Sequence, residues 1–252
     1  MTDTRIARFD SQTGEWHLSS YGACQVVKDV LNSVKSLLRY SLIHSIQARK
    51  LRRYISGCSG TVCLSLGSGR SVPSQGEWIG IDFKKGPGIF GCDLRRGIPI
   101  EPGTIDGVLA EHILEHFPLD DLPALLSSCL RVLKPGAPIR IVCPDADLVA
   151  SIIENKDTPR VSQQLRLDAS LHSWPFDDGL RDKVINRIVY QFGQHRSLLT
   201  AKSVQRELLK AGFRDCVVLT PDSTQYFERV PTTHFERFPD SKQECFVIEA
   251  VR

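Results

Sequence analysis

The chain has 252 residues, of which 41% are hydrophobic and 24% charged, and its formal net charge is +3. This length can bury a full core, and so small a charge excess leads us to expect no specific nucleic-acid partner. No apolar run is long enough to cross a bilayer, and the first residues lack the apolar stretch of a signal peptide. The eight cysteines are scattered without a CxxC pair, which predicts buried, reduced thiols in a cytoplasmic protein.

The first 56 residues read as an extension that precedes the main domain. Residues 1–24 are polar and lack periodicity, so we expect a loose N-terminus. Residues 26–55 place apolar side chains at spacings of three and four, which predicts an amphipathic helix with a basic polar face. Such a helix either packs on its own domain, which we favour, or makes weak contact with an anionic membrane surface.

The main domain, residues 57–252, opens with a pattern of strand, glycine turn, strand and acid. A short apolar run at 62–66 predicts a buried strand, and the sequence Gly67-Ser68-Gly69 follows at once. The next apolar run ends on Asp82, where a carboxylate can accept both hydroxyls of a ribose. A third segment ends on Asp93. This ordered set predicts a nucleoside-binding site.

Further strands and helices alternate along the rest of the domain, which predicts a parallel α/β sheet. The insertion at 155–195 and the long loop at 221–243 interrupt this rhythm, and we expect them to form the walls of a substrate pocket. The predicted strands are 106–110, 139–143, 214–220 and 244–251, and the predicted helices are 122–133, 146–154 and 200–209.

Several motifs resemble those of class I S-adenosylmethionine-dependent methyltransferases. They are LSLGSG at 64–69, GIDF at 80–83, CDL at 92–94, AEHILEHF at 110–117, LKPGAPIRIVCPD at 133–145 and HRSLLTAKSVQRELLKAGF at 195–213. The resemblance implies a Rossmann-like sheet that is mostly parallel, with a C-terminal antiparallel pair and helices on both faces. The chain departs from the family pattern at Ser65, where an acid or asparagine is usual, and at Arg70 and Ser71, where the third glycine is missing.

The resemblance implies S-adenosyl-L-methionine as the cofactor. The glycine turn would approach the methionine end, the acid after the second strand would hold the ribose, and the CDL segment would meet the adenine. The implied cofactor-binding residues are Ser65, Gly67, Ser68, Gly69, Asp82, Phe83, Asp93, Leu94 and Glu111.

Four side chains are candidates for activating the methyl acceptor: Glu111, His112 and His116, with His195 the weakest. The first three follow a predicted strand at the edge of the sheet where open α/β folds bind ligands. An unperturbed histidine has a pKa of about 6.5, which suits it to take a proton from a hydroxyl. The plainer interpretation is that these side chains only hold their loop.

His112-x-x-Glu115-His116 also matches the inverted zinc-protease motif. Such a site needs a third ligand, and because the sequence nominates none clearly, we expect no metal and rank a zinc hydrolase last.

We predict methyl transfer to an oxygen or nitrogen of an acceptor, a saccharide or another small molecule. The alternative is a module that binds S-adenosylmethionine or a nucleotide without catalysis.

Overall fold

The computed structural model describes residues 7–10, 15–18, 20–74 and 77–252. The chain divides into two compact units, Met1–Ile46 and Gln47–Arg252. In the first unit β1 (Ala7–Asp10) pairs antiparallel with β2 (Glu15–Leu18). The prediction of a loose N-terminus is therefore wrong for these eight residues. Each strand alternates apolar and polar residues, and the register pairs Ala7 with Leu18 and Phe9 with Trp16.

The helix α1 (Ser20–Ser56) begins in the first unit and ends in the second. Its last turns carry Ala48, Leu51 and Ile55, which are buried, and the last two belong to the main hydrophobic core. Packing is thus confirmed for this end of the helix. Val27 and Val30 near its start are more than half exposed, so membrane contact there stays a prediction. Among the described residues, no helix has the length and apolarity that a membrane span requires.

The second unit is built on a seven-stranded sheet in the order β5-β4-β3-β6-β7-β9-β8. Neighbouring strands run parallel except at β9, which is antiparallel to both β7 and β8. This confirms the predicted Rossmann-like methyltransferase sheet. The strands are β3 (Cys63–Leu66), β4 (Trp78–Asp82), β5 (Ile89–Gly91), β6 (Gly107–Glu111), β7 (Pro138–Pro144), β8 (Arg214–Leu219) and β9 (Cys245–Val251).

Side chains alternate between the two faces along β7 because successive residues of a strand point to opposite sides. Ile139 and Ile141 enter the main core, which also contains leucines of α2 (Leu122–Val132) and α6 (Ala201–Ala211). Val142 instead joins a small cluster with Phe235 of α7 (His234–Arg237). Different elements therefore pack on the two faces of the sheet. The helix α7 lies within the segment 221–243, which was predicted as a long loop that forms part of a pocket wall.

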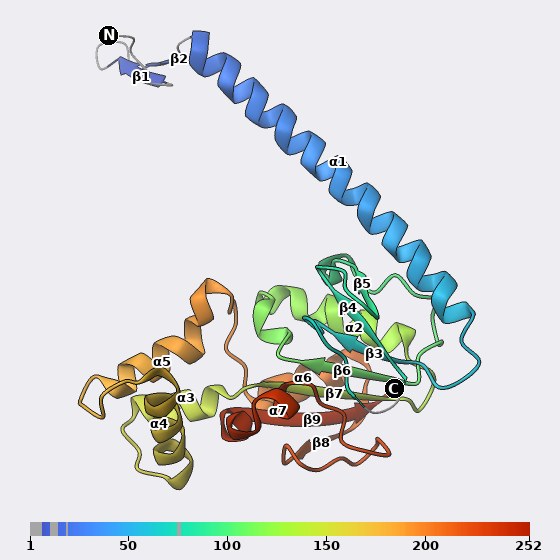
Figure 1. Cartoon of the computed structure of the whole chain (residues 1–252), viewed down its shortest axis with the longest axis vertical. Coiled ribbons are helices and arrows are strands. Elements are labelled where there is room, and N and C mark those ends of the chain that lie inside the picture. Colours follow the sequence, from blue (N-terminus) through green and yellow to red (C-terminus); the bar gives the residue numbers. More distant parts are fainter. Residues whose placement is uncertain (1–6, 11–14, 19, 75–76) are drawn as a thin grey trace. The chain divides into compact units, whose positions relative to one another are not determined.

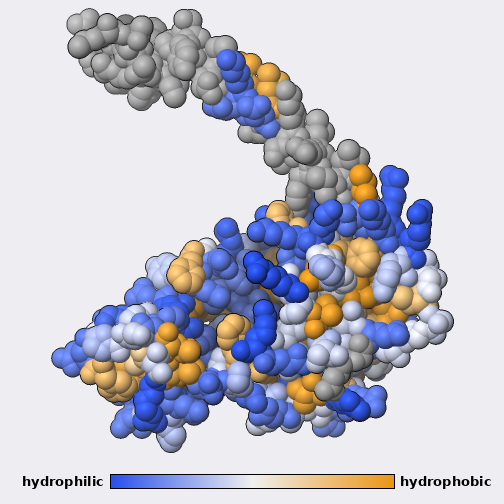
Figure 2. Space-filling model, in the orientation of Figure 1, coloured by the Kyte–Doolittle hydropathy of each residue, from blue (hydrophilic) through white to orange (hydrophobic). Residues whose placement is uncertain are grey.

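The insertion after β7 forms a helical subdomain with its own core, made by α3 (Ala146–Ile153), α4 (Pro159–His172) and α5 (Leu180–Tyr190). In Figure 1 these three helices lie together beside the sheet. Hydrophobic residues, orange in Figure 2, also appear on the surface of this group. Leu171, Phe176, Tyr190 and Phe192 are all more than 60% exposed.

The connection from β3 to β4 is short, and none of its described residues, 67–74 and 77, is helical. Gly67 turns the chain with φ of +63°, a conformation that glycine adopts without strain. A Cβ at this position would lie 2.6 Å from Cδ1 of Ile113, in the turn after β6. Glycine is thus required here both by the backbone and by the neighbouring loop.

Candidate active site

A cavity of about 370 Å³ lies at the carboxyl ends of β3, β4 and β6. Open α/β sheets bind ligands at this edge. Five of the predicted cofactor residues line the cavity: Gly67, Asp82, Phe83, Asp93 and Leu94. The lining also includes residues that were not predicted as cofactor-binding, among them Ile113, Phe117 and Arg196, because they come from turns whose positions depend on the folded chain.

The Asp82 carboxylate is held in place by two backbone amides. The amide of Gly69 donates to Oδ2 at 2.9 Å, and the amide of Lys84 donates to Oδ1 at 3.0 Å. A carboxylate offers about four acceptor sites, so each oxygen retains capacity for one more donor. The geometry thus suits a pair of ribose hydroxyls, one on each oxygen.

Two other predicted residues that line the cavity differ in how they are engaged. Asp93 caps the turn Leu94–Arg96 and accepts from the Arg95 guanidinium at 2.9 Å and 2.8 Å. Any adenine contact of Asp93 must therefore share the carboxylate with Arg95. Phe83 is 60% exposed, and a ring of this kind can stack on a planar base.

Ser65, Ser68 and Gly69 do not line the cavity. Ser65 lies inside β3, between Gly80 of β4 and Leu109 of β6, and is 2% exposed. Ser68 is also buried, and its hydroxyl has no hydrogen-bond partner among the described residues. Gly69 acts through its amide on Asp82. The structure therefore assigns these three residues to the support of the site, not to its surface.

Glu111 has a positioning role that differs from both predicted roles. Its carboxylate accepts from Thr232 Oγ1 at 2.5 Å, from the amide and hydroxyl of Thr233 at 2.6 Å and 2.8 Å, and from the His234 amide at 2.9 Å. Oε2 accepts three of these four hydrogen bonds and Oε1 accepts one, and Glu111 does not line the cavity beside Asp82. Glu111 instead fixes the start of α7 to the end of β6.

His112 stands in a buried group of partners and has φ of +51°. Its Nδ1 lies 3.1 Å from Glu115 Oε1 and its Nε2 lies 3.4 Å from Cys245 Sγ. The centroid of its ring lies 3.9 Å from that of His234, with the two rings tilted by 36°. Burial opposes protonation, yet the contacts with Cys245 and Glu115 raise the pKa of His112 well above its usual value. Burial raises the pKa of the Cys245 thiol, which favours its neutral form. The contact with His112 lowers the pKa of Glu115, so Glu115 is the negative charge that favours protonation of His112. A protonated His112 is a poor general base.

His116 and His195 come together from distant parts of the chain. Their ring centroids are 5.2 Å apart in an edge-on arrangement. His116 lines the cavity beside Asp82, whereas His195 lines a second cavity. Burial lowers the pKa of His195, which favours its neutral form. The prediction that both belong to the active site therefore has a geometric basis, with the pair placed where the two cavities approach.

The second cavity measures about 390 Å³ and is lined by both segments expected to form the pocket wall, the insertion and the loop that carries α7. Its buried wall is an ionic network in which Arg187 contacts Asp168 at 2.7 Å and Glu244 at 2.6 Å. His234 also lines it, and burial followed by the charges of His112 and Arg237 lowers its pKa to about 3. None of these residues was predicted.

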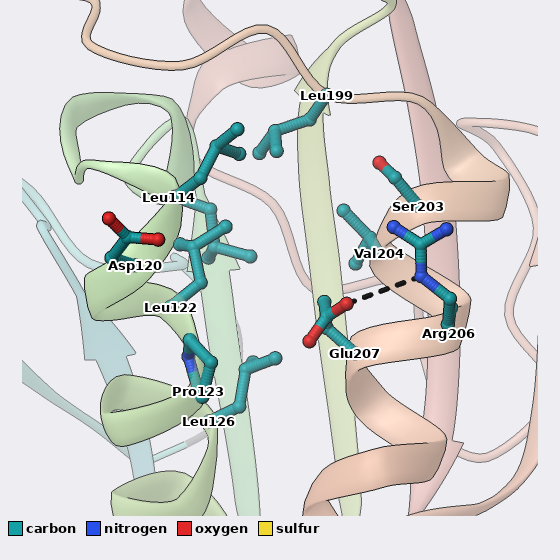
Figure 3. A pocket seen from close by; sticks show the side chains of 11 residues that line it. Leu114, Asp120, Leu122, Pro123, Leu126, Leu199, Ser203, Val204, Arg206 and Glu207 are labelled. Carbon is teal, nitrogen blue, oxygen red and sulfur yellow. Dashed lines mark hydrogen bonds and ion pairs between the residues drawn. The ribbon is translucent and has the colours of Figure 1, made fainter.

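A third cavity, of about 320 Å³, lies between α2 and α6. Figure 3 shows leucine side chains lining it and the ion pair between Arg206 and Glu207 on one side. It lies between two helices and is lined by none of the predicted site residues. We therefore assign it no part in the chemistry.

Comparison with known proteins places the chain in a family. A family model described as a methyltransferase domain matches residues 56–217, more than half of the chain. No curated protein sequence matches significantly.

Solved structures with a similar fold include three methyltransferases. One is an S-adenosylmethionine-dependent methyltransferase from Archaeoglobus fulgidus, with 17% identity over 83% of this chain and 94% of that chain and a TM-score of 0.47. Another, from Mesorhizobium loti, has 15% identity over 77% of this chain and 91% of that chain, with a TM-score of 0.45. A third is 1,6-didemethyltoxoflavin-N1-methyltransferase from Burkholderia thailandensis. It has 13% identity over 94% of this chain and 91% of that chain, with a TM-score of 0.43.

The order of the seven strands, the reversed β9 and the cavity beside Gly67 and Asp82 agree with the family match. The chain therefore belongs to the methyltransferase-domain family.

Proposed function

We propose that the protein binds S-adenosylmethionine in the cavity beside Asp82 and transfers its methyl group to an oxygen or nitrogen of a small-molecule or saccharide acceptor. The observation that carries the proposal is the Asp82 carboxylate, which two backbone amides hold at the cavity wall. The ribose hydroxyls would donate to it, and the methionine end would lie toward Gly67.

The second cavity is the proposed entrance of the acceptor. It adjoins the cofactor cavity through the neighbouring rings of His116 and His195. Its polar wall, with Asp168, Arg187 and Glu244, suits an acceptor rich in hydroxyl or amino groups, because those groups can replace water as hydrogen-bond partners. Methyl transfer is an in-line displacement, so alignment of the nucleophile with the methyl group supplies much of the rate.

Replacing Asp82 with alanine should weaken binding of S-adenosylhomocysteine by about 1–3 kcal/mol, because charge-assisted hydrogen bonds to the ribose are lost. Isothermal titration calorimetry on the full chain measures this change. Asp147→Ala, which removes an exposed acid at the start of α3, is the control and should bind like the wild type.

Equal affinities for a folded Asp82→Ala protein and the wild type would remove Asp82 from the site. Binding by the wild type without methyl transfer to any hydroxyl or amino acceptor would instead favour the module that lacks catalysis. A thermal melt of each variant separates lost binding from lost folding.

A further inference from the structure

Three side chains that can coordinate a metal gather where the two cavities approach. Glu115 and His116 lie in the turn after β6, and His195 follows α5 at the end of the insertion. Each offers a ligand atom within 4.8 Å of the other two. The two segments are fastened together, because the amides of Arg196 and Ser197 donate to the Glu115 carbonyl at 2.8 Å and 3.1 Å. The cluster is therefore built into the backbone.

Both imidazoles are oriented through their Nδ1 atoms. His116 Nδ1 lies 3.1 Å from the Gln194 carbonyl, and His195 Nδ1 lies 2.6 Å from the Ile188 carbonyl. A carbonyl oxygen only accepts, so each Nδ1 carries a proton, and the tautomer with that proton leaves the lone pair on Nε2. Metal-binding histidines are fixed in the same way, by a hydrogen bond from the other ring nitrogen.

Two atoms of the cluster are buried and have no partner. Glu115 is 2% exposed; its Oε1 contacts His112, but its Oε2 has no hydrogen-bond partner among the described residues. The same holds for Nε2 of His195. Burying a carboxylate oxygen and an imidazole lone pair without partners is costly. One cation between them would satisfy both.

We propose that Glu115, His116 and His195 bind a divalent transition-metal ion such as Zn²⁺. Two histidines and one carboxylate form a ligand set that zinc accepts, and three protein ligands leave a position open for substrate. Bonds of about 2.1 Å would bring the ligand atoms, now within 4.8 Å of one another, to about 3.4 Å. His112 is not a ligand, since it contacts Glu115 and Cys245, and His195 supplies the third ligand that the motif lacks.

The position of the ion between the two cavities points to a role in activating the methyl acceptor. This role rests on the proposed function. His116 lines the cofactor cavity and His195 the second one, so the open position can receive an acceptor oxygen. The ion lowers the pKa of that hydroxyl, and its proton passes to solvent. The oxygen then bonds to the methyl carbon, and the carbon–sulfur bond breaks with its electron pair left on sulfur. The acceptor class is thereby narrowed to hydroxyl compounds.

The test is calorimetric titration of Zn²⁺ into the chelator-treated full chain. The wild type should bind one ion, and His195→Ala and Glu115→Gln should each bind at least 100-fold more weakly. His172→Ala is the matched control, because His172 lines the same cavity as His195 but lies outside the cluster, and it should bind like the wild type. Circular dichroism confirms that each variant is folded, and Glu115→Gln keeps the shape of the side chain if His195→Ala does not fold.

Equal zinc affinity in the wild type, His195→Ala and Glu115→Gln would overturn the proposal, as would an equal loss in His172→Ala. A parallel titration with S-adenosylhomocysteine keeps the two proposals apart. Cofactor binding without zinc binding removes only the metal site, and zinc binding without cofactor binding removes only the proposed cofactor site.

Discussion

Replacing Arg140 with methionine should lower the free energy of unfolding by about 3–5 kcal/mol, because it leaves the buried carboxylate of Glu249 without its cation. The two side chains are directly paired across β7 and β9, their contact is 2.7 Å, and neither is measurably exposed. Arg140 also donates to the carbonyls of Ser223 and Pro221 at 2.8 Å. The same change should therefore loosen the start of the loop that leads to α7.

Urea denaturation of both proteins measures the difference. Lys156→Met is the control, because it breaks an ion pair with Glu154 in which both side chains are more than half exposed; it should cost about 0–1 kcal/mol. A similar small cost for Arg140→Met would mean that the remaining donors to Glu249, from Thr224 to Tyr226, are sufficient without the guanidinium.

Replacing Gly67 with alanine should lower the free energy of unfolding by about 2–5 kcal/mol. The left-handed conformation costs an alanine about 1–2 kcal/mol, and overpacking against Ile113 adds about 1–3 kcal/mol. Because Gly67 lines the cofactor cavity, displacement of Ile113 should also reduce the affinity for S-adenosylhomocysteine. Urea denaturation and calorimetry measure the two effects.

Gly69→Ala separates backbone strain from crowding. Gly69 has nearly the same φ, +62°, but a Cβ there meets no atom within 4 Å. We expect it to cost only about 1–2 kcal/mol. Should both variants lose the same stability, contact with Ile113 would not be the reason that position 67 needs glycine.

The sheet could be predicted because its strands are short apolar runs bounded by turn residues. The motifs also indicated where these strands lie along the chain. Arg140 is the exception within an apolar strand. Its place is explained by Glu249, whose pairing depends on the register of β7 with β9. The hairpin of β1 and β2 was missed because the alternation of apolar and polar residues extends over only four residues in each strand.

The residues of the cavity beside Asp82 could be predicted better than those of the second cavity. Gly67 and Asp82 lie at the ends of strands, and the local sequence pattern locates strand ends. Glu111 also ends a strand, but its function follows from Thr232 to His234, which reach it only in the folded chain. The proximity of His195 to Glu115 likewise depends on the fold of the helical insertion. No local sequence repeat predicts that fold.

The most direct test is a crystal structure of the full chain with S-adenosylhomocysteine. We predict that the ligand occupies the cavity at the ends of β3 and β4, with both ribose hydroxyls within hydrogen-bond distance of Asp82 and the sulfur on the side of Gly67 and His116. A ligand bound elsewhere, or a ribose turned away from Asp82, would contradict it.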